Sequence, residues 1–194
     1  MLAAGAGTRF GGEPKLLADL HGRPLVAHAV AAALAAREVE RVVVVVGAHG
    51  EAVARAAAAE ADRAASATRA TRRPRLDVVH CPGWAAGQSA SLRAGLAALA
   101  GSEKVLVLVG DQPGVTAAAI DRLAREPPGS RAAYEGRPGH PAVLGRELAG
   151  AAAGLSGDRG LRDVAGWRLV ECADVARGDD VDTWADLAAA RQCG

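Results

Sequence analysis

Short apolar runs alternate along the chain with longer stretches in which apolar residues recur at helical spacing. The five valines after Arg41 and the VLVLV sequence at 105–109 are typical of parallel strands that are buried on both faces. Between such runs, residues such as Val26, Val30 and Leu34 lie four positions apart and place an apolar stripe on a helix. The alternation predicts an α/β fold with helices around a mainly parallel sheet.

The same pattern sets approximate limits for the elements. Strands are expected at 1–4, 41–46, 76–80, 104–109, 131–134 and 167–172. Helices are expected from Pro24, which suits a first helical turn, over 51–65, around Leu92, Leu96 and Leu99, over 116–125 and over 183–192. Residues 131–161 break the alternation. At 194 residues, the chain is most simply one domain.

Composition narrows the classes of partner. The 23 basic and 22 acidic side chains give a net charge of +1, which offers no general case for nucleic acid or an anionic membrane. No apolar run approaches the roughly 20 residues of a membrane span, and no signal-peptide pattern is present, so we expect a cytoplasmic protein. Cys81, Cys172 and Cys193 form no CxxC pair and are expected to be reduced thiols. The arginine-rich stretch 63–75 is expected to be a solvated, mobile loop, with a phosphate-binding patch as the alternative.

Residues 1–17 form a glycine-rich loop with two cationic side chains. The glycines bare backbone N–H groups while Arg9 and Lys15 add positive charge, a combination that suits a polyphosphate. These glycines are Gly5, Gly7, Gly11 and Gly12. Glu13 stands where a P-loop needs lysine, and Phe10 where the dinucleotide fingerprint needs its third glycine. The form LAAGxGxRxGxxK is typical of nucleotidyltransferases. It is matched by Leu2, Ala3, Ala4, Gly5, Gly7 and Arg9, then by Gly11 or Gly12 and by Lys15, which comes one residue later than the strict spacing. A flexible glycine turn after a strand is the alternative.

Two acidic segments lie far from this loop in the sequence. Asp111 follows the strand at 104–109, and open α/β sheets bind ligands at the carboxyl ends of their strands. Asp180 and Asp182 alternate with a valine, so both carboxylates face one side of an extended segment. Asp111 and Asp182 could hold one Mg²⁺ that bridges nucleotide phosphates. Helix capping is the alternative for both, with Asp186 as the acidic member of a capping box near the end of the chain.

Ordered motifs along nearly the whole chain resemble those of the MobA-like nucleotidyltransferase family, and within it the molybdenum cofactor cytidylyltransferases. They are the LAAGxGxRxGxxK loop, WxxGxxxSL from Trp84, LxGDxP around Asp111, GxxGHPxxL around His140, LxGDxGxR from Leu155, and a DxDTPxDL segment in which Trp184 replaces the proline. The resemblance implies a Rossmann-like, three-layer α/β/α fold of the nucleotide-diphospho-sugar transferase type. Relatives normally carry several more residues before the loop, so we expect either a short first strand or a misassigned start codon.

The resemblance also implies roles for particular residues. Nucleotide binding would involve Leu2, Ala3, Ala4, Gly5, Gly7, Lys15, Gly87, Ser89, Ser91 and Asp111. Catalysis would involve Arg9, Lys15 and Asp111, metal binding Asp111 and Asp182, and acceptor binding His140, Asp158, Gly160 and Arg162. Taken as residues alone, the glycine and serines after Trp84 could simply cap a helix, and the acceptor-side residues could form turns. Residues 1–126 would then bind the nucleotide, 131–165 the acceptor, and 166–194 would close the domain.

The implied reaction is transfer of CMP from CTP to molybdopterin or its molybdenum-loaded form, with Mg²⁺ and release of pyrophosphate. A phosphate monoester acceptor, whose second pKa is about 6, needs no general base near pH 7. Ala4 favours CTP, because guanylyl relatives tend to have LAGG where this chain has LAAG. The alternatives are a guanylyl or other NTP transferase, an NAD(P)H-dependent quinone-type oxidoreductase like the nicotine-blue enzymes, and a carrier that hands the finished cofactor to a molybdenum hydroxylase.

Overall fold

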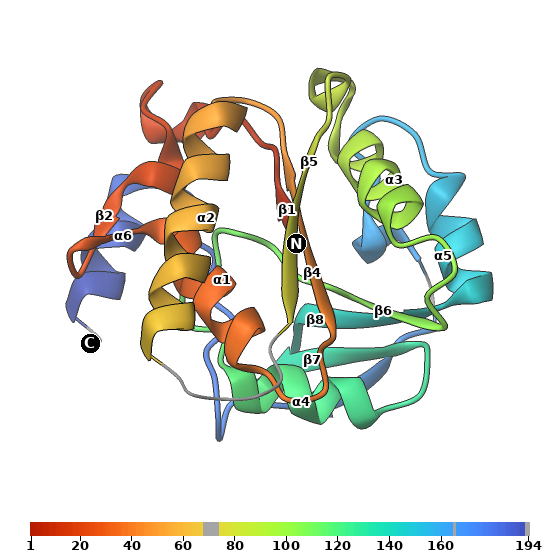
Figure 1. The fold of residues 1–194 in the computed structure, drawn as a ribbon. Coiled ribbons are helices and arrows are strands. Elements are labelled where there is room, and N and C mark those ends of the chain that lie inside the picture. Colours follow the sequence, from red (N-terminus) through yellow and green to blue (C-terminus); the bar gives the residue numbers. More distant parts are fainter. Residues whose placement is uncertain (68–73, 165, 193–194) are drawn as a thin grey trace.

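The computed structural model describes residues 1–67, 74–164 and 166–192. Apart from a separate pair, β2 and β3, its strands form two hydrogen-bonded sets that meet at β1 (Figure 1). The first set consists of parallel strands in the order β1 (Leu2–Ala3), β4 (Arg41–Val46) and β5 (Arg75–His80). The second has the order β6 (Lys104–Val107), β8 (Arg137–Gly145), β7 (Ser130–Tyr134) and β9 (Arg168–Glu171). Within it, β8 runs antiparallel to β6 and β7, whereas β7 and β9 are parallel.

The short strand β1 joins the two sets. The N–H of Leu2 donates to the carbonyl of Leu108 at 2.8 Å, and the N–H of Gly110 donates to the carbonyl of Leu2 at 2.9 Å. A parallel bridge between Leu2 and Val109 completes the junction, so the predicted mainly parallel sheet is confirmed. The chain moves outward from β1 through β4 to β5 and then returns to β6 on the other side of β1. Such a reversal of strand order is where open α/β sheets form ligand sites.

The valine run in β4 is buried on both faces, as its sequence predicts. Val44 and Val46 belong to one core cluster with residues of α1 (Leu25–Ala35) and α2 (Gly50–Ala67). Val43 and Val45 belong to a second cluster with residues of α3 (Gln88–Ala98). Figure 1 shows α1 and α2 on one side of β4 and α3 on the other. Side chains alternate across a strand, so a continuous valine run can serve both layers of helices.

The second set of strands is also covered on both faces. Leu123 of α4 (Ala117–Arg125) packs with Ala132 and other residues of β7, β8 and the segment after β9. Leu92 of α3 and Ala152 of α5 (Arg146–Ala153) pack with Leu144 on the other side. The sequence pattern did not predict α5. The last helix, α6 (Trp184–Gln192), lies beside β2 (Asp19–Leu20), which pairs with β3 (Arg23–Pro24).

Two local expectations concern Pro24 and the cysteines. The helix expected from Pro24 is present: Pro24 ends β3 and is the N-cap residue of α1, which begins one residue later at Leu25. Proline lacks an N–H, and a two-residue edge strand tolerates that loss. Cys81 and Cys172 are buried free thiols, and Cys193 lies outside the described residues.

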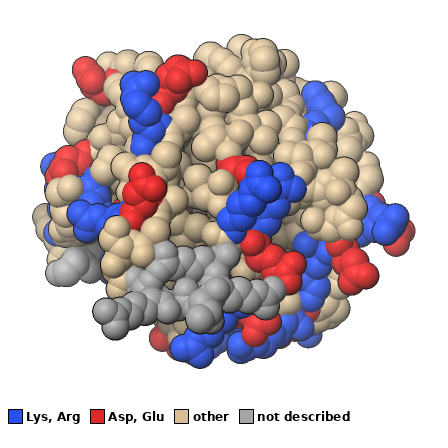
Figure 2. All heavy atoms as spheres, viewed as in Figure 1, with Lys and Arg blue, Asp and Glu red and all other residues tan. Residues whose placement is uncertain are grey.

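The arginine-rich stretch 63–75 begins on α2 and ends on β5. Arg75 and Arg41 both bind the carboxylate of Asp77, at 2.9 and 2.6 Å. Three of the five arginines of the stretch, at positions 69, 72 and 73, lie outside the described residues. Figure 2 shows acidic and basic side chains interspersed over one face of the molecule. None of the helices in the described part of the chain is long and apolar enough to cross a membrane.

Candidate active site

Lys15 lies between two carboxylates that come from distant parts of the sequence. Its Nζ donates to Asp111 Oδ2 at 2.7 Å and to Asp182 Oδ1 at 2.9 Å. Lys15 begins the 3₁₀ turn Lys15–Leu17 after the glycine-rich loop, Asp111 follows β6, and Asp182 precedes α6. The lysine side chain is 12% exposed, and those of the two aspartates are 24% and 27% exposed. The structure therefore brings the loop and both acidic segments to one place.

The ionic state of this cluster follows from its contacts. Burial alone would lower the pKa of Lys15, but the carboxylates of Asp111 and Asp182 outweigh burial and raise it, so Lys15 is an ammonium. Arg9 adds a salt bridge to Asp182 Oδ2 at 2.9 Å, but its side chain is 72% exposed and water screens the pair. Asp180 lies nearby: burial and the negative charges of Asp111 and Asp182 raise its pKa, while a hydrogen bond from Gln112 opposes the rise.

The last helix is capped by Thr183 and Asp186 and not by the side chain of Asp182. The carboxylate Oδ2 of Asp186 accepts from the N–H of Thr183 at 2.8 Å, and Thr183 Oγ1 accepts from the N–H of Asp186 at 3.2 Å. Thr183 and Asp186 thus form the reciprocal capping box of α6. The side chain of Asp182 takes no part in this box and instead binds Lys15 and Arg9.

The residues that come before the first glycine, Leu2 to Ala4, pack into the core and support the glycines. Ala3 and Ala4 are 2% and 4% exposed, and Leu2 packs against two core clusters. The carbonyl of Ala4 accepts from the N–H of Ala48 at 3.0 Å, which ties the loop to the end of β4. Gly5 is exposed, and no atom lies within 4 Å of the place where its Cβ would be. Its backbone is therefore open to a ligand.

Position 7 has room only for glycine, because the side chain of Lys15 packs against it. Gly7 has a φ of +65°, and a Cβ at this position would lie 2.8 Å from Lys15 Cβ. We expect Gly7→Ala to destabilise the fold by roughly 1–2 kcal/mol and to displace Lys15 from the carboxylates, which would reduce ligand binding. The measurements are urea unfolding and nucleotide binding.

Gly12→Ala is the matched control for that variant. Gly12 also has a positive φ, of +87°, but its Cβ would meet no atom within 4 Å. The control should therefore carry the backbone strain without the contact to Lys15. Equal loss of nucleotide binding in both variants would contradict the role given to the Gly7–Lys15 contact.

The segment after Trp84 approaches the loop through β4. A Cβ on Gly47, at the end of β4, would lie 2.5 Å from Trp84 Cβ and 2.8 Å from the carbonyl of Ala4. Gly87 precedes α3 with a φ of +108°, and no side chain caps this helix, so the simple capping interpretation does not hold. Ser89 is fully buried and its Oγ has no hydrogen-bond partner, while Ser91 is 5% exposed.

The segment expected to contact the acceptor packs directly on α3. The N–H of Ser89 donates to the carbonyl of Gly157 at 3.2 Å. A Cβ on Gly87 would lie 2.3 Å from the carbonyl carbon of Gly157, and one on Gly160 would lie 2.2 Å from Gln88 Oε1. Asp158 is exposed in this loop, and the side chain of Arg162 lies outside the described residues. The two predicted binding segments are thus structurally coupled.

His140 lies in β8, not in a turn. Its Nδ1 is 3.0 Å from the carbonyl oxygen of Val107, and Tyr134 donates its hydroxyl to the His140 carbonyl at 2.6 Å. Burial and the charge of Arg131 lower the pKa of His140 to about 4, so its ring is neutral near pH 7. A neutral ring whose Nδ1–H bonds a backbone carbonyl has a structural role.

This lowered pKa predicts a pH-dependent stability. Between about pH 6.5 and pH 4, an unfolded chain protonates this histidine and the folded chain does not, so stability falls as the pH falls. We expect the free energy of unfolding of the wild type to drop by about 1–2 kcal/mol more than that of His140→Gln between pH 7 and pH 5. Urea unfolding at the two pH values measures the difference, and equal drops would contradict the assignment.

Two features of this region escaped the sequence patterns. Trp184 packs on the buried ring of Phe10, with ring centroids 4.2 Å apart, and so fixes the start of α6 to the glycine-rich loop. Arg131 on β7 is buried beside His140 and Trp167. The available signals in the sequence were an aromatic residue in place of a motif proline and an arginine at the start of an expected strand.

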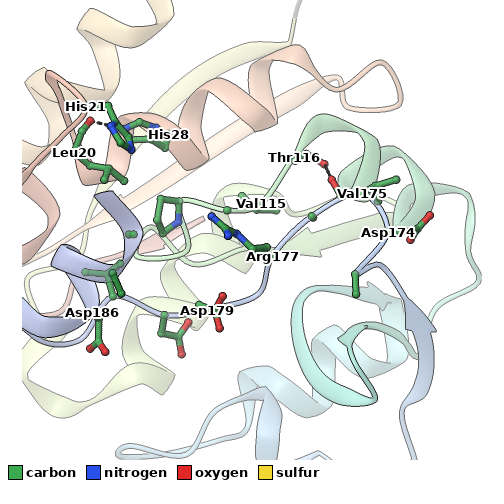
Figure 3. A pocket seen from close by; sticks show the side chains of 18 residues that line it. Leu20, His21, His28, Val115, Thr116, Asp174, Val175, Arg177, Asp179 and Asp186 are labelled. Carbon is green, nitrogen blue, oxygen red and sulfur yellow. Dashed lines mark hydrogen bonds between the residues drawn. The ribbon is translucent and has the colours of Figure 1, made fainter. Parts of the chain in front are cut away.

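Figure 3 shows a groove of about 750 Å³ near this cluster. Neither Lys15 nor Asp111 is among the residues that line it. Asp180 and Asp186 line one part of it, and Leu20, His28 and Thr116 line other parts. In Figure 3 the Arg177 side chain lies between His28 and Asp179. The groove shares the 179–186 segment with the active-site cluster, so movement of this segment would affect both.

Comparison with solved structures places this geometry among nucleotidyltransferases. A nucleotidyl transferase from Methanothermobacter thermautotroptrophicus superposes with a TM-score of 0.72 and 27% identity, covering 99% of this chain and 94% of the other. A Mycobacterium sp. strain JC1 homologue of the Mycobacterium tuberculosis protein Rv0371c gives a TM-score of 0.68 and 28% identity, covering 100% and 96%. The fold is therefore that of the nucleotide-diphospho-sugar transferases, as the resemblance implies.

Sequence comparison finds relatives with different activities. A nicotine blue oxidoreductase from Paenarthrobacter nicotinovorans is 36% identical over 199 residues, covering 94% of this chain and 90% of the relative. A 2-C-methyl-D-erythritol 4-phosphate cytidylyltransferase from Dechloromonas aromatica is 36% identical over 127 residues, covering 64% of this chain and 51% of the relative. The family model of the MobA-like NTP transferase domain matches residues 1–173. The chain therefore belongs to the MobA-like NTP transferase family.

Proposed function

We propose that this chain transfers CMP from CTP to a molybdopterin-type acceptor and releases pyrophosphate. The observation that carries the proposal is the double hydrogen bond of Lys15 to Asp111 and Asp182 at the end of the glycine-rich loop. This contact brings the ammonium of Lys15, which is suited to a phosphate, together with two carboxylates that are suited to a metal ion. In this proposal residues 1–126 bind the nucleotide, 131–165 bind the acceptor, and 166–194 close the site.

The donor set fits a divalent cation. Magnesium is usually bound by one or two carboxylates, with water and substrate phosphates as the other ligands. Asp111 and Asp182 each offer an oxygen within 3 Å of one Lys15 Nζ, so a cation could bind both carboxylates in place of the ammonium. The described residues contain no group of three or more His, Cys, Asp or Glu side chains that could hold a metal alone, which suits a site that the nucleotide completes. Bound there, Mg²⁺ would neutralise charge on the nucleotide phosphates.

The protein's own residues supply binding and electrostatic stabilisation. The open backbone at Gly5 and the side chains of Lys15 and Arg9 bind the triphosphate and stabilise the leaving pyrophosphate. An oxygen of the acceptor phosphate attacks the α-phosphorus, and the bond from that phosphorus to the pyrophosphate oxygen breaks. The acceptor phosphate is already ionised near neutral pH, so no side chain needs to remove a proton. The neutral ring of His140, bonded to a backbone carbonyl, agrees with this scheme.

In this proposal the base binds between the glycine-rich loop and the segment that precedes α3, which meet where Gly47 lies against Trp84 and the carbonyl of Ala4. The alanine at position 4 and the cytidylyltransferase activity of the Dechloromonas relative both favour cytidine. Pyrophosphate release with molybdopterin and Mg²⁺, compared for CTP, GTP and ATP, tests the proposal. CTP should be used fastest, and equal rates with all three nucleotides would defeat the cytidylyl assignment.

A second candidate is an NAD(P)H-dependent quinone-type oxidoreductase. It is favoured by the 36% identity to nicotine blue oxidoreductase over 94% of this chain. Phe10 opposes it, because it fills the place of a dinucleotide-loop glycine and is buried under Trp184. Oxidation of NADPH by a quinone-like acceptor, with no pyrophosphate release from any nucleotide, would support this candidate over the transferase.

A further inference from the structure

Arg131 is a buried cation that forms no ion pair with any side chain that the structure describes. Its side chain belongs to β7 and is 9% exposed, yet no carboxylate among the described residues forms an ion pair with it. Its Nε donates to the carbonyl of Gly139 at 2.7 Å, and its guanidinium carbon lies 6.0 Å from the ring centroid of Trp167. Burial of an unpaired charge is costly, so such a group is expected to serve a ligand.

The terminal nitrogens of this guanidinium are available to a ligand. Within the described residues, two side-chain atoms are fully buried and lack a hydrogen-bond partner, namely Arg23 Nε and Ser89 Oγ. The terminal nitrogens of Arg131 are not among them and form no hydrogen bond to the described residues, so they keep contact with solvent. The bond to Gly139 and the Trp167 ring hold the guanidinium in place. A planar, fixed guanidinium with free donors is suited to a phosphate or carboxylate.

Arg131 also lies close to the carboxylate cluster. Arg131 bonds to Gly139 and is therefore a neighbour of His140. The positive charge of Arg131 helps to lower the pKa of His140. The negative charge of Asp180 acts on Arg131 in turn, from beyond ion-pair distance. Arg131 is therefore a residue of the acceptor part that lies next to His140 and within reach of the charge of Asp180.

We propose that Arg131 binds an oxyanion of the acceptor, a phosphate or a carboxylate, at the acceptor side of the active site. The proposal rests on the transferase function proposed above. It selects acceptors that carry an anionic group and rejects neutral ones, because a neutral acceptor would leave the buried guanidinium unpaired.

The test uses calorimetry with two successive ligands. The full-length protein is first saturated with Mg²⁺ and α,β-methylene-CTP, which fills the triphosphate loop, and inorganic phosphate or acetate is then titrated. We expect phosphate or acetate to bind the wild type, Arg131→Gln to bind it at least about tenfold more weakly, and Arg131→Lys to keep part of the affinity. The stronger of the two probes identifies the group as phosphate or carboxylate.

Arg137→Gln is the matched control, because Arg137 lies on the adjacent strand β8 with its side chain 79% exposed. It should bind the anion like the wild type, and all variants should bind the nucleotide analogue equally, which shows that they are folded. Unchanged anion binding in Arg131→Gln, or no anion binding to the wild type, would overturn the proposal. If the wild type fails to bind the analogue, the transferase function fails. Anion titration of the free protein then still decides, since loss in Arg131→Gln but not in Lys15→Gln supports the Arg131 site and retention in Arg131→Gln overturns it.

Discussion

Replacing Lys15 with alanine is expected to lower pyrophosphate release from CTP by at least about a hundredfold. Its ammonium contacts both Asp111 and Asp182. In the proposed mechanism it stabilises the negative charge on the triphosphate and on the leaving pyrophosphate. The variant should stay folded, because all three side chains are partly exposed and the two carboxylates remain solvated without it. Steady-state kinetics and urea unfolding measure the two effects.

The chain contains a matched control for this substitution. Lys104 is the other lysine, and its Nζ donates to the carbonyls of Ala124 and Glu126 at 2.8 and 2.9 Å, away from the acidic cluster. Lys104→Ala should keep the activity of the wild type and lose only some stability. A Lys15→Ala protein as active as Lys104→Ala would remove Lys15 from the mechanism.

Asp111→Ala is expected to abolish transfer to a similar degree, again with at least about a hundredfold loss. Asp111 follows the central strand β6 and binds Lys15 at 2.7 Å, so its removal takes away both a metal ligand and the partner that positions the lysine. The loss should persist as the Mg²⁺ concentration is raised. Pyrophosphate release measured over a range of Mg²⁺ concentrations tests this.

Asp174→Ala serves as the control for Asp111. Asp174 is an aspartate whose exposed carboxylate binds Arg122 at 2.6 Å, at the rim of the separate groove. It should cost little activity, because a surface ion pair of this kind contributes about 1 kcal/mol or less. A fully active Asp111→Ala enzyme would contradict the metal assignment.

Much of the fold follows from local patterns in the sequence. The valine run of β4 and the stripe on α1 specify a doubly covered parallel strand and the helix packed on it. Helix α5 was missed because its segment, RELAGAAA, contains a glycine and begins without a side-chain cap. The hairpin of β2 and β3 was missed because two-residue strands are too short to show an alternating pattern.

The candidate site was predictable only in part. Motifs that follow β1 and β6 could be grouped in advance, because these strands end at the same edge of a sheet. The contact of one lysine with acids 96 and 167 residues away depends on how the elements pack, which local spacing does not encode. Arg131 belongs to no motif, since only the folded chain shows that this strand residue is buried and forms no ion pair within the described residues.

The central claim is that the chain moves a nucleotidyl group to an acceptor. The most direct measurement incubates the wild type with Mg²⁺, molybdopterin and CTP that carries a radioactive α-phosphate, and separates the products by chromatography. The account predicts that the label moves into an acceptor–CMP product together with an equal amount of unlabelled pyrophosphate, and that Lys15→Ala forms neither. Label that stays in CTP or appears as free CMP would contradict it.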